Sequence, residues 1–325
     1  MNFQAFKSKY QKAPVKEYPN SVTDSPVVSV CVMTYQHKDY IRECLDSILM
    51  QQTDFPFEIL LGDDASTDGT REMCIEYAER HPDTIRLFLH DRANNIHING
   101  SPTGRFNFLY SLYSARGKYI ALCEGDDYWT DPEKLKKQLT IFQHNPEIGI
   151  CYTLVKKCFP PYKSERLEKL NINKSFYSLD EYIEDDTPFI NTCSWLVDSY
   201  LLKDIESIDS FAFGDLQIAL SILNKKKVIY CLEEVMAVYR VLNQSASHFD
   251  KNKKREVAFF YDKVMCQCAY ISDAKKKKVK LQQFYIKYFH LLPLLSFNYY
   301  KRLRIVSLLP KKKSKKSLLK YLFNG

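Results

Sequence analysis

The sequence predicts an α/β fold, in which a mostly parallel sheet is flanked by helices and followed by a basic, helical C-terminal extension. Three observations lead to this prediction. Strand-like and helix-like segments alternate over residues 1–150, and polar or acidic residues follow three of the expected strands. The sign of the net charge also changes near residue 250. Such alternation is typical of parallel strands with helices on both faces.

Hydrophobic periodicity predicts the elements of the first half. Buried strands are short apolar, β-branched runs, whereas helices repeat apolar residues every three or four positions. The expected strands are 27–34, 57–61, 85–89 and 119–123. The expected helices are 38–50, 69–80, 106–115 and one that opens at Asp131-Pro132. Asp68 and Asp131 are the expected N-caps of the second and fourth helices.

The second half is less regular. Strand-like runs occur at 149–153, 192–197 and 228–232, and a helix is expected from Phe213-Gly214-Asp215 to Leu223. From residue 251 onward the chain is predicted to form basic helices.

Composition indicates the cellular setting. The ten cysteines include no CxxC pair, and several lie in apolar runs, so reduced thiols in a cytosolic protein are expected. The N-terminus lacks the apolar stretch of a signal peptide, and no run reaches the ~20 apolar residues of a spanning helix. The sequence therefore predicts a cytoplasmic protein without a membrane anchor of that kind.

The net charge of +8 conceals two oppositely charged parts. Residues 251–325 hold 20 Lys and Arg against 3 Asp and Glu, so residues 1–250 carry the acidic excess. A basic segment with interspersed apolar clusters favours peripheral binding to anionic lipid, with a solvated tail as the alternative. Nucleic-acid binding is not expected, because no recognisable binding module is present.

An acidic loop, Glu124-Gly125-Asp126-Asp127, directly follows the fourth expected strand. Three carboxylates so close together repel one another unless a cation neutralises them. Ligands that are all oxygen favour Mg²⁺ or Mn²⁺. The loop therefore predicts a divalent-cation site that grips a diphosphate, and an ordinary acidic loop before a helix is the alternative.

A second acidic pair, Asp63-Asp64, follows the second expected strand. Ligands of open parallel sheets bind outside the carboxyl ends of the strands, so both acidic groups are expected at one edge of the sheet. A carboxylate there can accept hydrogen bonds from a nucleobase or a ribose, and a turn-forming role is the alternative. The sequence contains neither GxGxxG after the first strand nor GxxxxGK[ST], so a dinucleotide fold and a P-loop are unsupported.

Three blocks of the sequence resemble the family 2 glycosyltransferases of the GT-A fold. They are VSVCVMTYQHKDYIRECLDSIL, EILLGDDASTDGT and GKYIALCEGDDYWTDPEKLKKQ, in this order and at these spacings. The similarity is strong over 1–150, weaker to about 248, and nearest to bacterial members that build cell-surface polysaccharides. It implies a GT-A, Rossmann-like fold that uses a nucleotide sugar.

The resemblance also implies roles for individual residues. Thr34 and Tyr35 are expected against the nucleotide base, and Asp64 matches the carboxylate that binds base or ribose. Glu124 and Asp126 match the acidic positions of the DxD motif and are the expected metal ligands, with Asp127 in the same pocket. Glu124 departs from the family, which usually has Asp at this position.

The resemblance places the catalytic base at the start of a helix in the second half, where this chain has Asp215. A base is required because the acceptor hydroxyl loses its proton as it attacks. A helix-capping role for Asp215 is the alternative, and Asp185 and Asp186 are the fallback candidates.

Other residues near these motifs are weaker candidates. Arg240, in a block that resembles the family's closing YR motif, is expected at the phosphates or in a structural salt bridge. The histidine of many relatives is replaced by Leu242, and His248 is a possible substitute. Tyr128 and Trp129 could stack on an acceptor sugar, and His37 and His97 could be metal ligands. For all four residues, however, packing or solvation is the favoured interpretation.

The predicted activity is transfer of a sugar, of the hexosyltransferase type, from a nucleoside diphosphate to a hydroxyl of a glycan or lipid-linked acceptor. Inversion and dependence on Mn²⁺ or Mg²⁺ are expected. A sugar nucleotidyltransferase and a catalytically inactive scaffold at the membrane are the alternatives. Oligomerisation is left open.

The predicted domains follow this assignment. They are an N-terminal extension (1–25), a GT-A domain (26–250) and a basic helical region (251–325) on the cytoplasmic face of the membrane. The GT-A domain divides into a nucleotide-sugar half (26–150) and an acceptor and catalytic half (151–250).

Overall fold

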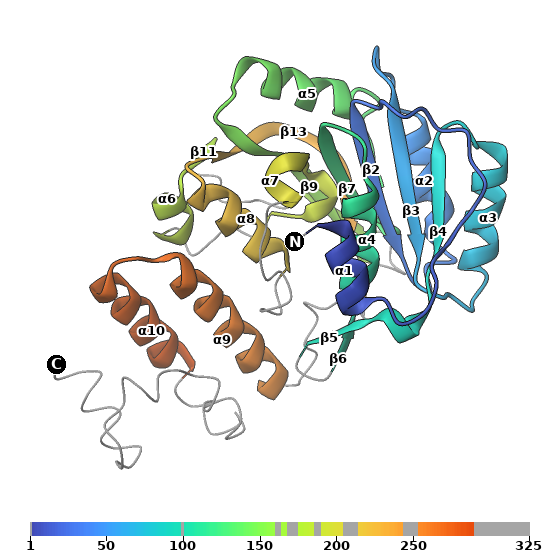
Figure 1. Ribbon diagram of the computed structural model, residues 1–325. Helices are drawn as coiled ribbons and strands as arrows, with labels where there is room; N and C mark the ends of the chain where they lie inside the picture. The colour runs from blue at the N-terminus through green and yellow to red at the C-terminus, as the bar shows by residue number, and fades with distance from the viewer. Residues whose placement is uncertain are drawn as a thin grey trace. The chain divides into compact units, whose positions relative to one another are not determined.

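The computed structural model describes residues 2–98, 101–159, 164–167, 175–184, 190–203, 214–242 and 253–288 (Figure 1). The chain forms two compact units, Met1–Ser245 and Ala246–Gly325. The first unit contains the sheet and the residues of the predicted donor site.

A large mixed sheet with a parallel core is the centre of the first unit. Its strand order is β1-β4-β3-β2-β7-β12-β9-β13-β11. The pairs β4–β3, β3–β2, β2–β7 and β9–β13 are parallel, whereas β12 is antiparallel to both of its neighbours. The strands on this path are β1 (Lys16–Glu17), β2 (Val28–Thr34), β3 (Phe57–Asp63), β4 (Ile85–Leu89), β7 (Tyr119–Glu124), β9 (Ile148–Phe159), β11 (Phe176–Tyr177), β12 (Leu196–Asp198) and β13 (Val228–Arg240).

Shorter strands complete the described part of the unit. β10 (Ser164–Leu167) pairs with β9, β8 (Tyr128–Trp129) pairs with β13, and β5 (Ile96–Ile98) forms a hairpin with β6 (Ser101–Thr103).

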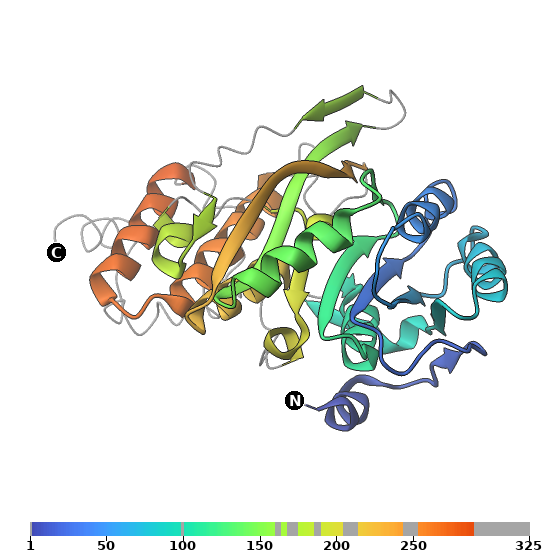
Figure 2. The same cartoon turned by 90° about the horizontal axis from the view of Figure 1, so that it is seen from above.

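Helices cover both faces of the sheet (Figures 1 and 2). One face packs on α2 (Ile41–Leu49), α3 (Thr70–Arg80) and α5 (Lys134–His144). In α2 the buried apolar residues recur at helical spacing, which explains why this segment forms an amphipathic helix. The other face carries α4 (Arg105–Ser114), which lies against β2 and β3. The second half adds α6 (Leu179–Glu184), α7 (Ser199–Lys203), α8 (Gly214–Asn224) and the single turns η1 (Arg92–Asn94) and η2 (Thr192–Ser194).

The elements expected in the first half are confirmed within a few residues. Asp68 is not the N-cap of α3, because Gly69 occupies that position with a left-handed φ of 105°. Asp68 still accepts hydrogen bonds from the backbone N–H and the hydroxyl of Thr70. Asp68 therefore stands one residue before the N-cap, and its carboxylate still accepts a hydrogen bond from a backbone N–H of the first turn.

The expected N-cap of the fourth helix is wrong. α5 begins at Lys134, and Asp131 instead accepts a 2.7 Å hydrogen bond from the backbone N–H of Glu133. The side chain of Asp131 thus closes a turn with Glu133, and the helix begins only after this turn. The strand expected at 228–232 is also longer than predicted, because β13 continues past register shifts beside β9 to Arg240.

The N-terminal extension folds onto the first unit. α1 (Phe3–Tyr10) buries Phe6 completely, and its ring lies 5.2 Å from that of Phe106 on α4. β1 then pairs with β4 along the outer side of the sheet.

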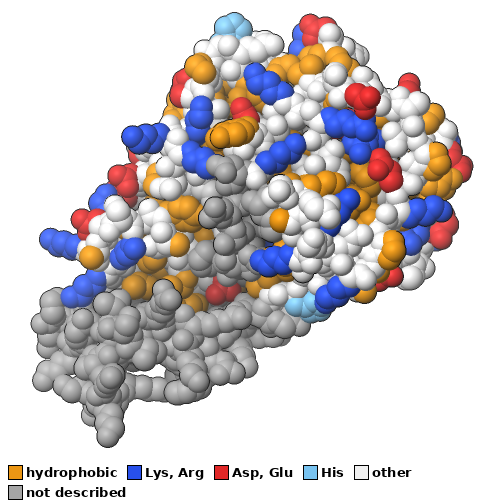
Figure 3. Space-filling model, in the orientation of Figure 1, with side chains coloured by type: hydrophobic (Ala, Val, Ile, Leu, Met, Phe, Trp, Pro, Cys, Tyr) orange, Lys and Arg blue, Asp and Glu red, His pale blue; other side chains and the backbone are white. Residues whose placement is uncertain are grey.

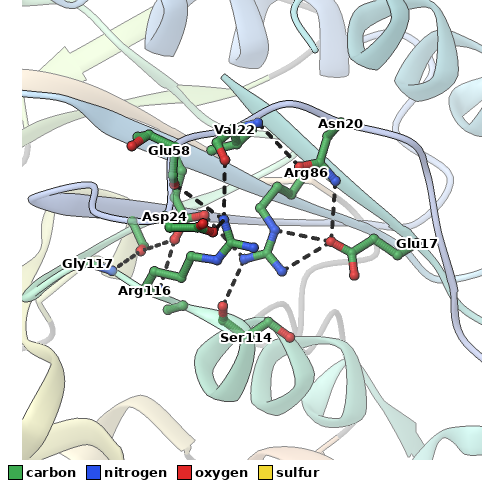
Figure 4. A network of polar contacts seen from close by, with 12 residues as sticks. Glu17, Asn20, Val22, Asp24, Glu58, Arg86, Ser114, Arg116 and Gly117 are labelled. Carbon is green, nitrogen blue, oxygen red and sulfur yellow. Dashed lines mark hydrogen bonds and ion pairs between the residues drawn. The ribbon is translucent and has the colours of Figure 1, made fainter. Parts of the chain in front are cut away.

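A buried polar network ties this extension to the amino ends of the strands (Figure 4). Glu58, which is fully buried, accepts hydrogen bonds from Ser29 and from the backbone N–H of Arg116, and pairs with Arg86 at 3.3 Å. Arg86 also pairs with Glu17 at 3.1 Å. A buried carboxylate persists only when it is compensated in this way, so the network fixes the edge of the sheet opposite to the predicted site.

The described part of the second unit consists of α9 (Lys253–Tyr270) and α10 (Ala274–Tyr288). Basic helices were expected here. Within the residues that the structure describes, no helix has the length and apolar character needed to cross a bilayer. All ten cysteines of the chain are free and buried.

Candidate active site

Three neighbouring parallel strands end at the same edge of the sheet. In the register of the sheet, Thr34 of β2 lies opposite Asp63 of β3, and Met33 of β2 lies opposite Glu124 of β7. The Asp63-Asp64 pair and the acidic loop, 60 residues apart in sequence, therefore meet on either side of the end of β2. This convergence was expected from the sequence and is confirmed.

Asp64 has one oxygen held and one oxygen without a partner. Its Oδ2 accepts hydrogen bonds from Arg92 at 3.0 Å and from Asn95 at 3.1 Å. Its Oδ1 is buried and has no hydrogen-bond partner among the described residues. Burial raises the pKa of this carboxyl, although Asn95 and Arg92 oppose the shift. An oriented acceptor of this kind is suited to a ligand N–H or O–H group.

Tyr35 forms the outer wall of this corner. The residue is 39% exposed, and the guanidinium carbon of Arg92 lies 4.0 Å from the centroid of its ring. Neither Arg92 nor Asn95 was selected from the sequence. Both follow β4, so the rule that ligand residues come after strand ends, applied to the strand at 85–89, points to them.

Asp63 has a different role from its neighbour. Its side chain is fully buried and pairs with Arg71 of α3 at 2.5 Å. The pair joins β3 to α3 and leaves Asp64 as the carboxylate with an unpartnered oxygen among the described residues.

Gly125 allows the acidic loop to approach β2 closely. A Cβ atom at this position would lie 2.7 Å from the hydroxyl of Thr34 and 3.0 Å from Nδ1 of His37. A larger residue would push Asp126 away from β2. His37 Nε2 lies 4.0 Å from Asp126 Oδ1, and burial lowers the pKa of His37, with Asp126 opposing the shift.

Glu124 is fixed at one oxygen and free at the other. Its Oε1 accepts a 2.5 Å hydrogen bond from Thr192 of η2, and its Oε2 is buried without a hydrogen-bond partner in the described residues. Burial raises the pKa of Glu124 to about 7, and the negative charges of Asp126 and Asp215 add to the shift. Asp215, in the first turn of α8, is thus close enough to the acidic loop to influence it electrostatically.

Asp127 and Arg240 join the acidic loop to β13. The backbone N–H of Arg240 donates to Asp127 at 2.8 Å, and its guanidinium donates to the carbonyl of Asp126 at 2.6 Å and pairs with Glu43. Arg240 is only 5% exposed. This geometry matches the structural salt bridge, which the sequence left as the alternative to a phosphate contact. Asp127 is buried, and burial followed by the charges of Asp126 and Glu124 raises its pKa.

The remaining candidate residues pack against other groups, are exposed to solvent, or lie outside the described residues. Trp129 is 1% exposed and donates to the carbonyl of Cys193, so it packs and offers no surface for an acceptor. The ring of Tyr128 lies 4.5 Å from the Arg240 guanidinium. His97 is exposed and contacts the Asn95 carbonyl. The predictions for Asp185, Asp186 and His248 lie outside the described residues.

Comparison with known proteins now decides the family. The profile described as Glycosyl transferase family 2 matches residues 29–205, which are more than half of the chain. The chain belongs to glycosyl transferase family 2.

Individual relatives agree with this family 2 assignment. An uncharacterized protein of Mycobacterium tuberculosis is 45% identical over 125 residues, which cover 38% of this chain and 34% of that protein. The chain thus spans about a third of the length of its mycobacterial relatives. The putative teichuronic acid biosynthesis glycosyltransferase TuaG of Bacillus subtilis is 24% identical over 266 residues, which cover 78% of this chain and 98% of TuaG.

Solved structures share the fold of this family 2 chain. S. aureus TarS in complex with UDP-GlcNAc superposes with a TM-score of 0.58 at 18% identity, covering 91% of this chain and 78% of TarS. The mannosyltransferase PcManGT from Pyrobaculum calidifontis, in complex with GDP-Man and Mn²⁺, superposes with a TM-score of 0.54 at 19% identity, covering 98% and 91%. The fold is of the GT-A type.

The acidic loop of this family 2 chain has the donors that a hard divalent cation requires. Glu124 Oε2 is a buried oxygen without a hydrogen-bond partner among the described residues, Asp127 is buried beside the Cys193 thiol, and Asp126 stands beside them half-buried. Within the described residues, no three His, Cys, Asp or Glu side chains form a complete cage. Mg²⁺-like ions in nucleotide sites usually take one or two carboxylates plus substrate phosphates, so the residues present fit such an ion.

Proposed function

We propose that this protein transfers a sugar from a nucleoside diphosphate to a hydroxyl group of a glycan or lipid-linked acceptor. The observation that carries the proposal is the meeting of two groups at one edge of the sheet, the oriented carboxylate of Asp64 and the acidic loop. The negative charge of Asp215, in the first turn of α8, adds to the upward shift of the Glu124 pKa, which supports a base near the acidic loop.

The donor is assigned to the two acidic corners. The base and ribose lie against Thr34, Tyr35 and Asp64, whose free Oδ1 accepts a donor hydrogen. The diphosphate extends toward Asp126 and Glu124, which hold Mn²⁺ or Mg²⁺. When bound, the ion supplies Lewis-acid stabilisation of the negative charge on the departing nucleoside diphosphate.

Asp215 is assigned as the general base. Its carboxylate takes the proton of the acceptor hydroxyl while the oxygen forms a bond to the anomeric carbon and the bond to the diphosphate breaks. One base with in-line attack inverts the configuration at that carbon. Asp215 also accepts a 2.8 Å hydrogen bond from the backbone N–H of Leu216, which holds it at the start of α8.

The substrate class is proposed from the relatives. TuaG and GgaB of Bacillus subtilis are named for the biosynthesis of teichuronic acid and of minor teichoic acid, and we assign this chain a hexosyl transfer in polysaccharide synthesis.

A panel of nucleotides tests the proposed donor site. Binding of UDP, GDP, dTDP and CDP, each with Mn²⁺ and with EDTA, is measured by calorimetry. We expect one nucleotide to bind most tightly and EDTA to weaken its affinity at least about tenfold, because the acidic loop repels an unmetallated diphosphate. If none of the four binds under either condition, the catalytically inactive scaffold becomes the better explanation.

Peripheral membrane binding is proposed for the basic region 251–325. On the face shown in Figure 3, the basic side chains of the described residues lie among acidic and apolar ones. The excess of positive charge is a property of the C-terminal sequence. Each basic residue near an anionic surface contributes about 1 kcal/mol.

Deletion of residues 285–325 tests this proposal, with retention on phosphatidylserine vesicles as the measurement. We expect the truncated protein to leave these vesicles in sedimentation while its affinity for nucleotide is unchanged. Neutral phosphatidylcholine vesicles are the control for charge. Equal retention of the full-length and truncated proteins on anionic vesicles would show that the tail is a solvated segment.

A further inference from the structure

The N-terminal residues 3–18, here called the strap, contact the turn that orients Asp64. The contact is made by Asn94, the last residue of η1, which is 1% exposed. Its Oδ1 accepts hydrogen bonds from the backbone N–H groups of Lys12 and Ala13, both at 2.7 Å. Its Nδ2 donates to the carbonyl of Ala13 at 3.0 Å. Within the described residues, all three side-chain hydrogen bonds of Asn94 are therefore made to the strap.

The residues on either side of this contact hold the Asp64 carboxylate. Arg92 and Asn95 both donate to Asp64 Oδ2, and Arg92 also stacks on Tyr35. They belong to the same short turn as Asn94, in which the N–H of Asn95 bonds back to the carbonyl of Arg92. A single turn of 3₁₀ helix has few bonds of its own, so its position depends on what anchors it.

The strap is a rigid anchor because it is fixed at both ends. α1 packs its buried Phe6 against Phe106 and Tyr113 of α4. Beyond Ala13, the backbone is anchored by the pairing of β1 with β4 and by the N–H of Tyr18, which donates to the carbonyl of Leu87. Lys12 and Ala13 are the part of the strap that reaches η1.

We propose that the strap, acting through Asn94, is a positioning element for nucleotide recognition. It sets the position of η1, so that Arg92 and Asn95 keep Oδ2 of Asp64 occupied and Oδ1 directed to the ligand. Asn94 is a positioning residue, because it acts through its neighbours and is bonded to the strap. The strap lies before the residues matched by the family profile, which begins at residue 29. This inference rests on the proposed donor site.

Asn94→Ala is the direct test, with nucleotide and pyrophosphate as separate probes. The variant is measured by calorimetry with Mn²⁺, using the preferred nucleoside diphosphate of the wild-type protein and then inorganic pyrophosphate. We expect the Kd for the nucleotide to rise about fivefold or more, because anchoring hydrogen bonds are lost. The Kd for pyrophosphate is expected to stay within about twofold, because the acidic loop is untouched.

Two further variants separate positioning from stability. Lys12→Pro removes one N–H donor to Asn94 from the strap side, and the preceding Gln11 is already extended, as a residue before proline requires. This variant should also raise the Kd for the nucleotide. Tyr18→Phe, the matched control, removes the strap contact to Glu79 and should lower the Tm without changing the Kd.

Each outcome has one reading. An unchanged nucleotide Kd in folded Asn94→Ala or Lys12→Pro would overturn the role of the strap. An equal loss of nucleotide and pyrophosphate affinity would also overturn it, since it would indicate general destabilisation. If the wild-type protein binds pyrophosphate but no nucleotide, the proposed donor site is wrong, independently of the strap.

Discussion

Replacing Asp215 with asparagine should abolish sugar transfer while the donor still binds. Asparagine keeps the size of the side chain and an oxygen that can accept from the Leu216 N–H, but it cannot take the acceptor proton. General-base catalysis contributes roughly 10²- to 10⁴-fold, so kcat should fall by that factor. The nucleotide Kd should change by less than about twofold, because Asp215 is not among the residues assigned to the base, the ribose or the metal. Steady-state transfer and calorimetric binding measure the two quantities.

Asp198→Asn provides the matched control for this variant. Asp198 also accepts from a backbone N–H at the start of a helix, α7, through a 2.9 Å hydrogen bond from Tyr200. In the pairing of β12 with β7, Asp198 lies opposite Tyr119, which is at the other end of β7 from the acidic loop. A loss of about 1 kcal/mol in stability is expected for either change if capping is disturbed. Near wild-type turnover of Asp215→Asn would remove Asp215 as the base and leave it a helix-terminus residue.

Replacing Asp126 with alanine should remove the metal-dependent part of donor binding. The Asp126 side chain is 18% exposed and is held at the end of β2 by the close approach of Gly125. Without it, we expect the Kd for the nucleotide in Mn²⁺ to rise at least about tenfold, to the value that the wild type shows in EDTA. Asp54→Ala removes the same charge from an exposed loop before β3, at the other edge of the sheet, and should have no effect.

The pH dependence of binding provides a second measurement of this site. A carboxyl whose pKa is raised stays protonated below that value, and metal ligands must be deprotonated. Because the pKa of Glu124 is raised to about 7, chiefly by burial, metal-dependent affinity should fall as the pH drops through about 7 and level off above it. Glu124→Gln should bind more weakly and lose this transition. If nucleotide binding to Asp126→Ala still responds to EDTA as in the wild type, the metal is held elsewhere.

Much of the nucleotide half was predictable because its signals are local. A buried parallel strand is a short apolar run, and the residue that follows it reaches the ligand edge whatever the distant sequence contains. Thr34, Asp64 and the acidic loop were found in this way. The same rule applied to the strand at 85–89 would have included Arg92 and Asn95.

Roles that depend on partners could not be predicted. Asp63 and Asp64 are chemically identical neighbours, yet Arg71 neutralises the first and the second keeps a free oxygen. Arg240 resembled a phosphate ligand, but Glu43 and the carbonyl of Asp126 occupy its guanidinium. Such differences come from groups far apart in sequence, which only folding brings together.

The sequence by itself determined the α/β class, the family resemblance and the set of carboxylates, because periodicity and motif spacing are properties of contiguous residues. Only the tertiary structure decided which oxygen of each carboxylate is held and which is free, that Thr192 tethers Glu124, and that Asn94 connects the strap to Asp64. These contacts join segments separated by 68, 82 and 31 residues, and a hydrogen bond across such a distance depends on packing, which no local pattern encodes.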